Sequence, residues 1–286
     1  MQVAELLVGD IDIKPQPGKY SLVQSHKAIA ANHVLFAGVL DLYAFDYAQI
    51  REFAMHSLSI LSKELPNCKH IAMTMHGIGY GLDEKESFIS QIAGLTDAFK
   101  KGLVPDSLER VSIVEKNPGR AERLRDLLSQ YYQSVSAQGN WSIESPPDVP
   151  EINSMGAQSN SVPHVFVAMP FSDSMEGVFV FGIQGPVNAA GYLCERVDMV
   201  AFTGDILTRI KLRIETAALV IADLTGASAN VYLEVGYAWG KERPTLLVTQ
   251  NSDELKFDVR GHRCIVYKNI NDLAKKLSAF LADLEF

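Results

Sequence analysis

The sequence is poor in cysteine and in charge, and it lacks a long apolar run. Of its 286 residues three are cysteines, and 21% are Asp, Glu, Lys or Arg. Cys68, Cys194 and Cys264 lie too far apart for a zinc site or a disulfide framework, so we expect buried, reduced thiols. No stretch approaches the ~20 apolar residues that span a bilayer, and residues 1–10 lack the basic start of an export signal. We therefore expect a cytoplasmic chain with no membrane partner.

An excess of basic charge is also absent. The formal net charge is −8, from 34 acidic and 26 basic residues. Such a chain has no long-range attraction for a polyanion, which excludes a DNA duplex as partner but leaves a small anionic ligand open. The histidines of the N-terminal half show no ligand spacing, so no metal is expected. By contrast, the 47% of apolar residues predicts a globular chain, long enough for two domains.

A linker is predicted over residues 134–163. Ser, Asn, Gly and Pro cluster there, and no apolar period of 2.0 or 3.6 residues survives. The sequence therefore predicts an N-terminal domain over residues 1–133 and a C-terminal domain over residues 164–286.

The C-terminal segment alternates short apolar runs with helical patterns. Strands are expected over 164–171, 192–198, 218–224, 244–250 and 263–268, and helices over 180–190, 205–216, 230–240 and 271–284. The run 218–224 is apolar throughout, which is typical of parallel strands covered on both faces. Ile206, Ile210 and Ile214 form one helical stripe, with Arg209 outside it. This pattern predicts a doubly wound parallel sheet.

The N-terminal segment is less regular. We expect strands over 3–11, 69–76 and 110–116 and an amphipathic helix over 46–65. Asp83 and Glu86 have the spacing of a capping box, and Asn117 with Pro118 marks the start of another helix. The predicted fold class is therefore α/β, with two Rossmann/flavodoxin-like parallel-sheet domains joined by the linker.

Three glycines, Gly77, Gly79 and Gly81, follow a predicted strand and precede a helix. Such a loop lets backbone N–H groups approach a phosphate at a helix N-terminus, as in a ligand-sensing domain. Against this, Asp83 and Glu84 place negative charge in the same turn, and the spacing is not that of a dinucleotide-binding loop. Phosphate binding and a tight structural turn both remain open for these glycines.

Two carboxylates are expected at the C-terminal sheet. Ligands bind at the carboxyl ends of parallel strands, where Asp223 ends a strand and Glu234 lies in the first turns of the next helix. In one crevice, one carboxylate could act as nucleophile or stabilise a cationic sugar while the other moves protons, which cleaves an N-glycosidic bond. The alternative is that Glu234 complements the helix dipole and Asp223 caps a loop.

Four stretches around these residues resemble the nucleoside 2-deoxyribosyltransferase superfamily and the related bacterial TIR-like enzymes. They are, in order, Val165–Phe171, Gly204–Leu207, Ile221–Gly226 and Asn230–Ala238. The resemblance implies that Glu234 is the catalytic residue and that Asp223 contacts the sugar. It places Phe171 and the following loop at the base or nicotinamide. The substrate-binding candidates are Met169, Phe171, Ser172, Asp205, Arg209 and Asn230.

The two-domain layout bears on the activity. Deoxyribosyltransferases of nucleoside salvage are typically single small domains, whereas nearly half of this chain forms another α/β unit. The chain looks like bacterial antiviral effectors, in which a nucleotide-sensing domain of CARF-like or macro-like architecture controls an NAD-cleaving domain. The resemblance implies NAD+ as substrate, no cofactor, a nucleotide second messenger as activator, and self-association into dimers or filaments. Two alternatives remain, namely a nucleoside or nucleotide deoxyribosyltransferase or N-glycosidase with a regulatory domain, and a non-catalytic nucleotide-binding scaffold.

Overall fold

The computed structural model describes residues 13–41, 44–136, 156–197 and 204–284. The chain forms two compact units, of which the first comprises Met1–His76 and Ser87–Ala157 and the second comprises Gly77–Glu86 and Gln158–Phe286. The second unit therefore holds the predicted C-terminal domain and, in addition, a ten-residue segment from the N-terminal half, which the sequence analysis had placed in the other domain.

The described part of the first unit contains two small sheets. Its strands are β1 (Tyr20–Gln24) and β2 (His33–Ala37), which pair antiparallel, and β3 (His70–Thr74) and β4 (Arg110–Val114), which pair parallel. The parallel pair was predicted, whereas the β1–β2 hairpin was missed. In the loop that connects β1 and β2, His26 and Lys27 lie in the left-handed region, with φ of 47° and 68°. Glycine usually occupies such positions and signals the turn, and here it is absent. The predicted strand over residues 3–11 lies outside the described residues.

Capping side chains start the helices of the first unit where the sequence predicts. The helices are α2 (Tyr47–Glu64), α3 (Glu84–Lys100) and α4 (Pro118–Ser136). Asp46 Oδ1 accepts from the Gln49 amide at 3.1 Å, and Asn117 Oδ1 accepts from the Arg120 amide at 3.0 Å. Each bond satisfies one of the donors left free in a first helical turn. These two predicted helix starts are confirmed.

A five-stranded parallel sheet organises the second unit. Its strands are β5 (His164–Ala168), β6 (Leu193–Glu195), β7 (Leu219–Asp223), β8 (Thr245–Thr249) and β9 (Cys264–Val266), in the spatial order β6-β5-β7-β8-β9. This is the flavodoxin-like order, in which the chain direction across the sheet reverses between the first and third strands. Every residue of β5 and β7 is buried, as their continuous apolar runs predict. The α/β fold class is confirmed.

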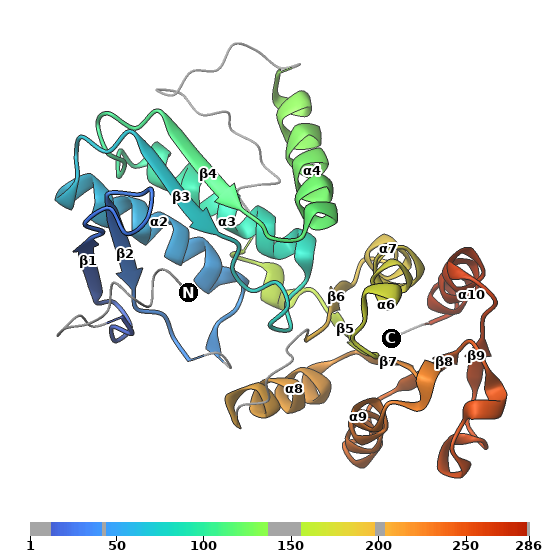
Figure 1. The fold of residues 1–286 in the computed structure, drawn as a ribbon. Helices are drawn as coiled ribbons and strands as arrows, with labels where there is room; N and C mark the ends of the chain where they lie inside the picture. The colour runs from blue at the N-terminus through green and yellow to red at the C-terminus, as the bar shows by residue number, and fades with distance from the viewer. Residues whose placement is uncertain (1–12, 42–43, 137–155, 198–203, 285–286) are drawn as a thin grey trace. The chain divides into compact units, whose positions relative to one another are not determined.

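Helices cover both faces of this sheet (Figure 1). They are α6 (Asp173–Gly177), the π-helix η3 (Val178–Gln184), α7 (Gly185–Ala189), α8 (Gly204–Thr216), α9 (Ala229–Gly240) and α10 (Ile270–Ala282), with short 3-10 turns η2 (Ser159–Ser161), η4 (Thr225–Ala227), η5 (Ser252–Glu254) and η6 (Phe257–Val259). The core on the α10 side joins Val165 and Ile221 of the sheet to Leu273 and Leu277 of α10. On the other face, α8 and α9 pack against β5 and β7. The sheet is thus covered on both faces, and the carboxyl and amino ends of its strands are left open.

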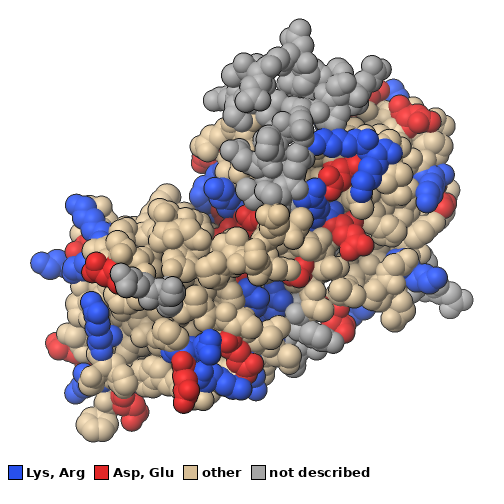
Figure 2. All heavy atoms as spheres, turned by 180° about the vertical axis from the view of Figure 1, so that it is seen from behind, with Lys and Arg blue, Asp and Glu red and all other residues tan. Residues whose placement is uncertain are grey.

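The surface shows both signs of charge. On the face drawn in Figure 2, Lys and Arg side chains are interspersed with Asp and Glu among a larger uncharged area. In the described ranges no helix combines the length and apolar character of a membrane span. The three cysteines are free thiols; Cys194 is buried as expected, whereas Cys68 and Cys264 are only partly buried.

Candidate active site

A pocket of about 270 Å³ opens at the carboxyl ends of β5 and β7, in the second unit. This is the point where the strand order reverses, and ligands of open α/β sheets bind at such points. Its walls come from the loop after β5, the end of β6, α8 and the start of α9, with the lining residues Met169, Pro170, Phe171, Val197, Ile210, Ser228, Asn230, Val231 and Glu234.

A tight turn directs α9 toward this pocket. Gly226 and Ala227 follow β7 with φ of 74° and 50°, so two successive residues lie in the left-handed region. Gly226 adopts it at little cost, whereas Ala227 must be held there by its surroundings. The Ala227 amide donates to Leu224 O at 3.0 Å, which closes the turn. As a result, Ser228 becomes the N-cap residue of α9 at the strand end.

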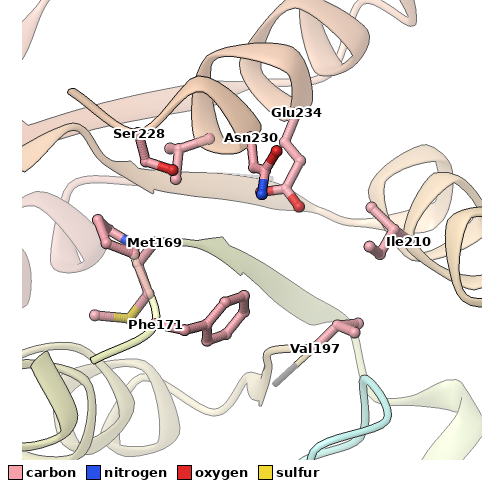
Figure 3. A pocket seen from close by; sticks show the side chains of 9 residues that line it. Met169, Phe171, Val197, Ile210, Ser228, Asn230 and Glu234 are labelled. Carbon is pink, nitrogen blue, oxygen red and sulfur yellow. The ribbon is translucent and has the colours of Figure 1, made fainter. Parts of the chain in front are cut away.

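Among the described residues that line the pocket, Glu234 is the one titratable residue. Desolvation by burial raises the pKa of its carboxyl from 4.5 to about 7. Within the described ranges, no side chain or backbone group is hydrogen-bonded to it. Figure 3 shows its carboxylate beside the Asn230 amide, facing Phe171 across the pocket. A carboxyl group with these properties gains and loses a proton near neutral pH, as a catalytic acid or base must.

The remaining pocket residues offer an apolar wall and a small polar rim. Phe171 is 47% exposed at the mouth, which leaves its ring available to a flat ligand. The Ser228 hydroxyl and the Asn230 amide, from the start of α9, have no hydrogen-bond partner in the part of the chain that the structure describes. No Lys, Arg or His is found among the lining residues that the structure describes. The pocket therefore suits an uncharged or cationic ring with hydroxyl groups beside it.

Asp223 lies outside the pocket lining and is fully buried. Its Oδ2 accepts a hydrogen bond from the Tyr267 hydroxyl at 2.6 Å, and its Oδ1 accepts from the Thr225 amide at 2.9 Å. Burial raises the pKa of Asp223, and these hydrogen bonds oppose the shift. Gln250 joins the network through its backbone N–H, which donates to Thr225 Oγ1 at 3.1 Å. Asp223 thus ties the ends of β7, β8 and β9 to the turn that begins α9.

The structure brings four of the predicted site residues together and leaves three apart. Met169, Phe171, Asn230 and Glu234 line the pocket, whereas Ser172, Arg209 and Asp223 are not among its described lining residues. Ser172 is the N-cap residue of α6, and its hydroxyl lies 2.8 Å from that of Ser174. Arg209 is buried, although the sequence placed it outside the apolar stripe of α8, and its Nε donates to Tyr80 O at 3.3 Å. Asp205 lies in the first turn of α8, and its side chain is outside the described part.

The three glycines form a turn within the second unit. Gly77, Gly79 and Gly81 all have positive φ, of 84°, 80° and 88°, a backbone conformation that favours glycine. Tyr80, between the last two, forms an isolated antiparallel bridge with Val197. The loop therefore packs against the sheet that carries the pocket, whereas the sequence had assigned it to the other domain.

Sequence reasoning missed three kinds of lining residue. Val197 follows β6, and the strand-end rule could have found it once β6 was placed beside β5. Ser228 lies two residues before Asn230, at a position that N-cap preferences favour. Ile210 belongs to a stripe that was interpreted only as core, and no local pattern distinguishes a pocket wall from a core contact.

No family model and no curated protein matches this chain. Among solved structures, the chain has a likeness to a CMP N-glycosidase of Clostridium botulinum, BcmB, with a TM-score of 0.34 and 17% sequence identity. The likeness covers 40% of this chain and 98% of that one. A TM-score of this size establishes neither a shared function nor shared site residues.

Proposed function

We propose that the second unit cleaves an N-glycosidic bond, with Glu234 acting at the sugar carbon C1′. The observation that supports this most is the position of Glu234, which lies without a described partner in a pocket at the reversal point of the sheet. Its pKa of about 7 keeps a large ionised fraction at neutral pH. An ionised carboxylate beside C1′ stabilises the positive charge that develops there as the bond breaks.

The reaction needs one water molecule and one proton acceptor. The bond between C1′ and the base nitrogen breaks, and its electron pair leaves with the nitrogen. Water then adds its oxygen to C1′, and the proton that it loses passes to Glu234 and from there to solvent. The ring of Phe171 would lie against the departing base, and the Asn230 amide and Ser228 hydroxyl would bind sugar hydroxyls.

The pocket chemistry favours NAD+ over neutral nucleosides as substrate. A neutral purine or pyrimidine leaves more easily when an acid protonates it, which usually takes a second carboxyl group. Nicotinamide is bound to its ribose as a cation and leaves as a neutral molecule without a proton. A site whose described lining holds one carboxyl group, Glu234, and no basic side chain fits that leaving group best.

In this proposal Asp223 supports the site instead of contacting the sugar, which departs from the role that the family resemblance implies. Both of its carboxylate oxygens accept hydrogen bonds from within the protein. Its partner Thr225 opens the turn that leads to Ser228 and Asn230. The group that acts on substrate is then Glu234 alone.

The proposal extends to regulation. We propose that a nucleotide second messenger bound by the first unit activates NAD+ cleavage, that activity accompanies self-association, and that the chain acts as an antiviral effector. Sedimentation of the full chain with and without cyclic oligonucleotides tests the assembly. A larger species that forms together with activity supports this extension, and full activity of a monomer contradicts it.

The central experiment measures release of free base by chromatography. The full chain is incubated with NAD+, a deoxynucleoside or a nucleoside monophosphate, with and without a panel of cyclic oligonucleotides. Nicotinamide release that disappears in Glu234→Gln supports the proposal. Base release only in the presence of an acceptor base would assign a transferase. Binding of a nucleotide without any base release would leave the non-catalytic scaffold.

A further inference from the structure

The segment Gly77–Glu86, here called the strap, is bound to the edge strand of the pocket sheet. Asp83 is the central contact: its Oδ2 accepts from the Cys194 amide of β6 and from Asn188 Nδ2, both at 2.9 Å. Its Oδ1 accepts from the Glu86 amide at 2.9 Å and so caps α3. Asp83 is 1% exposed, and burial raises its pKa while these N–H donors oppose the shift. The carboxylate of one residue thus joins a helix start to a sheet edge.

The strap also covers the edge that β6 would otherwise leave open. Among the described strands β6 pairs with β5 alone, so the N–H and C=O groups on its other side need partners. The strap supplies one of them, since Asp83 accepts from the Cys194 amide, and its Tyr80 forms an antiparallel bridge with Val197, two residues past the end of β6. Figure 3 shows this loop, in cyan, next to Val197 at the pocket wall. The edge of the sheet is therefore completed by residues from the N-terminal half of the chain.

The strap also contacts the pocket-lining residue Val197 and Arg209, the neighbour of the lining residue Ile210. A Cβ atom on Gly81 would lie 3.1 Å from Val197 Cγ2, so strap and wall are in close contact. The Tyr80 carbonyl accepts from Arg209 Nε at 3.3 Å, and Arg209 precedes the lining residue Ile210 on α8. Any displacement of the strap must therefore move Val197, Arg209 or both, because packed interiors leave little free space.

We propose that the strap is a positioning element of the pocket, in which Asp83 fixes β6 and thereby sets the wall formed by Val197. The residues that precede and follow the strap, His76 and Ser87, belong to the first unit. The chain thus leaves the first unit after His76 and returns to it at Ser87, on either side of the strap. The effect of the strap on catalysis rests on the proposed function, whereas its effect on the position of Val197 does not.

The test compares two aspartates that cap helices in the same way. Asp83→Ala removes a helix cap and the hold on β6, whereas Asp46→Ala removes the cap of α2 in the first unit. In the full chain, we expect Asp83→Ala to speed hydrogen exchange of the Cys194 amide by about tenfold or more, and Asp46→Ala to leave it unchanged. The pKa of Glu234, followed by carboxyl NMR, should fall in Asp83→Ala because water reaches the wall, and should stay constant in Asp46→Ala.

Kinetics provide the second readout. If the chain cleaves NAD+, Asp83→Ala should raise KM more than it lowers kcat. Asp83→Asn, which keeps one acceptor oxygen, should raise KM less than Asp83→Ala does. Equal exchange rates and equal Glu234 pKa values in Asp83→Ala and Asp46→Ala would overturn the proposal. Absence of NAD+ cleavage in the unaltered chain would instead count against the proposed function, since exchange and NMR need no turnover.

A glycine pair serves where Asp83→Ala does not fold. Gly81→Ala and Gly102→Ala both place a side chain at positive φ, but only the first meets neighbours, of which Val197 at 3.1 Å is nearer than Arg209 and Arg213. The strain of the left-handed conformation is common to both, so their difference reports contact with the pocket wall. We expect the Glu234 pKa to change in Gly81→Ala alone. The same pKa in both variants would contradict a role of the strap in setting the wall.

Discussion

Two carboxyl groups near the end of β7 differ in what surrounds them. Burial raises the pKa of both Asp223 and Glu234. Asp223 accepts hydrogen bonds from Tyr267 and Thr225, whereas Glu234 has no hydrogen-bond partner in the described ranges. Asp223 is fully buried and its oxygens are satisfied, so it holds the structure together, whereas Glu234 is only partly buried and remains available to a ligand. Exposure and hydrogen-bond partners therefore both distinguish the supporting carboxyl group from the one that can act on a ligand.

The largest effect is expected for Glu234→Gln. The amide keeps the shape of the side chain but cannot stabilise a cationic sugar or accept a proton. Base release should fall by about 100-fold or more, with the melting temperature unchanged or higher. Glu242→Gln, at an exposed position just after α9, is the matched control and should retain full activity. A fully active Glu234→Gln would remove the distinction drawn between the two carboxyl groups.

The stability of the protein should depend on pH through Glu234. Its pKa is about 7 in the folded chain against an ordinary 4.5, so the unfolded chain releases this proton first as pH rises. The free energy of unfolding should therefore fall between pH 4.5 and pH 7, by about 3 kcal/mol from this group, and level off above. Glu234→Gln should lose this contribution.

Urea unfolding at pH 5 and pH 8 measures the contribution of Glu234 to the free energy of unfolding. The pH-dependent difference of the unaltered chain minus that of Glu234→Gln isolates the carboxyl group, because other titrating groups cancel. An identical pH dependence in both proteins would show that Glu234 is well solvated, and the pocket argument would fail with it.

An intermediate effect is expected at the buried carboxyl group of the pair, Asp223. Tyr267→Phe deletes the donor to Asp223 Oδ2 and leaves a buried acceptor without it, which should cost about 1–3 kcal/mol of unfolding free energy. Tyr20→Phe is matched, since the Tyr20 hydroxyl donates to Glu64 at the same 2.6 Å but on the surface, and should cost close to nothing. If both variants lose equal stability, the Asp223 network has no special structural role.

Local signals in the sequence were sufficient for much of the fold. The apolar runs predict β5 and β7, the amphipathic pattern over 46–65 predicts α2, and Asn117 with Pro118 predicts where α4 begins. These features depend on neighbours within four residues. The β1–β2 hairpin depends on the same scale but lacks the usual turn residues, and was therefore missed.

Side-chain partners far apart in the sequence could not be predicted in this way. Asp223 and Tyr267 are 44 positions apart, and Asp83 and Cys194 are 111 apart. A capping box correctly marked Asp83 as a helix start, but nothing local indicates that its second oxygen holds β6. The same limit applies to the carboxylates of the site, since spacing placed Glu234 and Asp223 at one strand end without indicating which one has partners.

The smallest effect is expected at the mouth of the pocket, where Phe171 can be compared with an exposed phenylalanine elsewhere on the second unit, Phe257. Phe171 lines the pocket at 47% exposure, and Phe257, at 87% exposure, is not among the lining residues. Removal of an aromatic ring that stacks on a base costs about 1 kcal/mol or more, so Phe171→Ala should raise KM about fivefold. Phe257→Ala should leave KM unchanged, and neither variant should alter kcat strongly, because neither ring carries charge or a proton. Steady-state kinetics with the substrate identified by base release measures both. Equal KM values in the two variants would mean that the ligand lies deeper, against Glu234 and Asn230 only. The residues that contact the ligand would then all come from the start of α9.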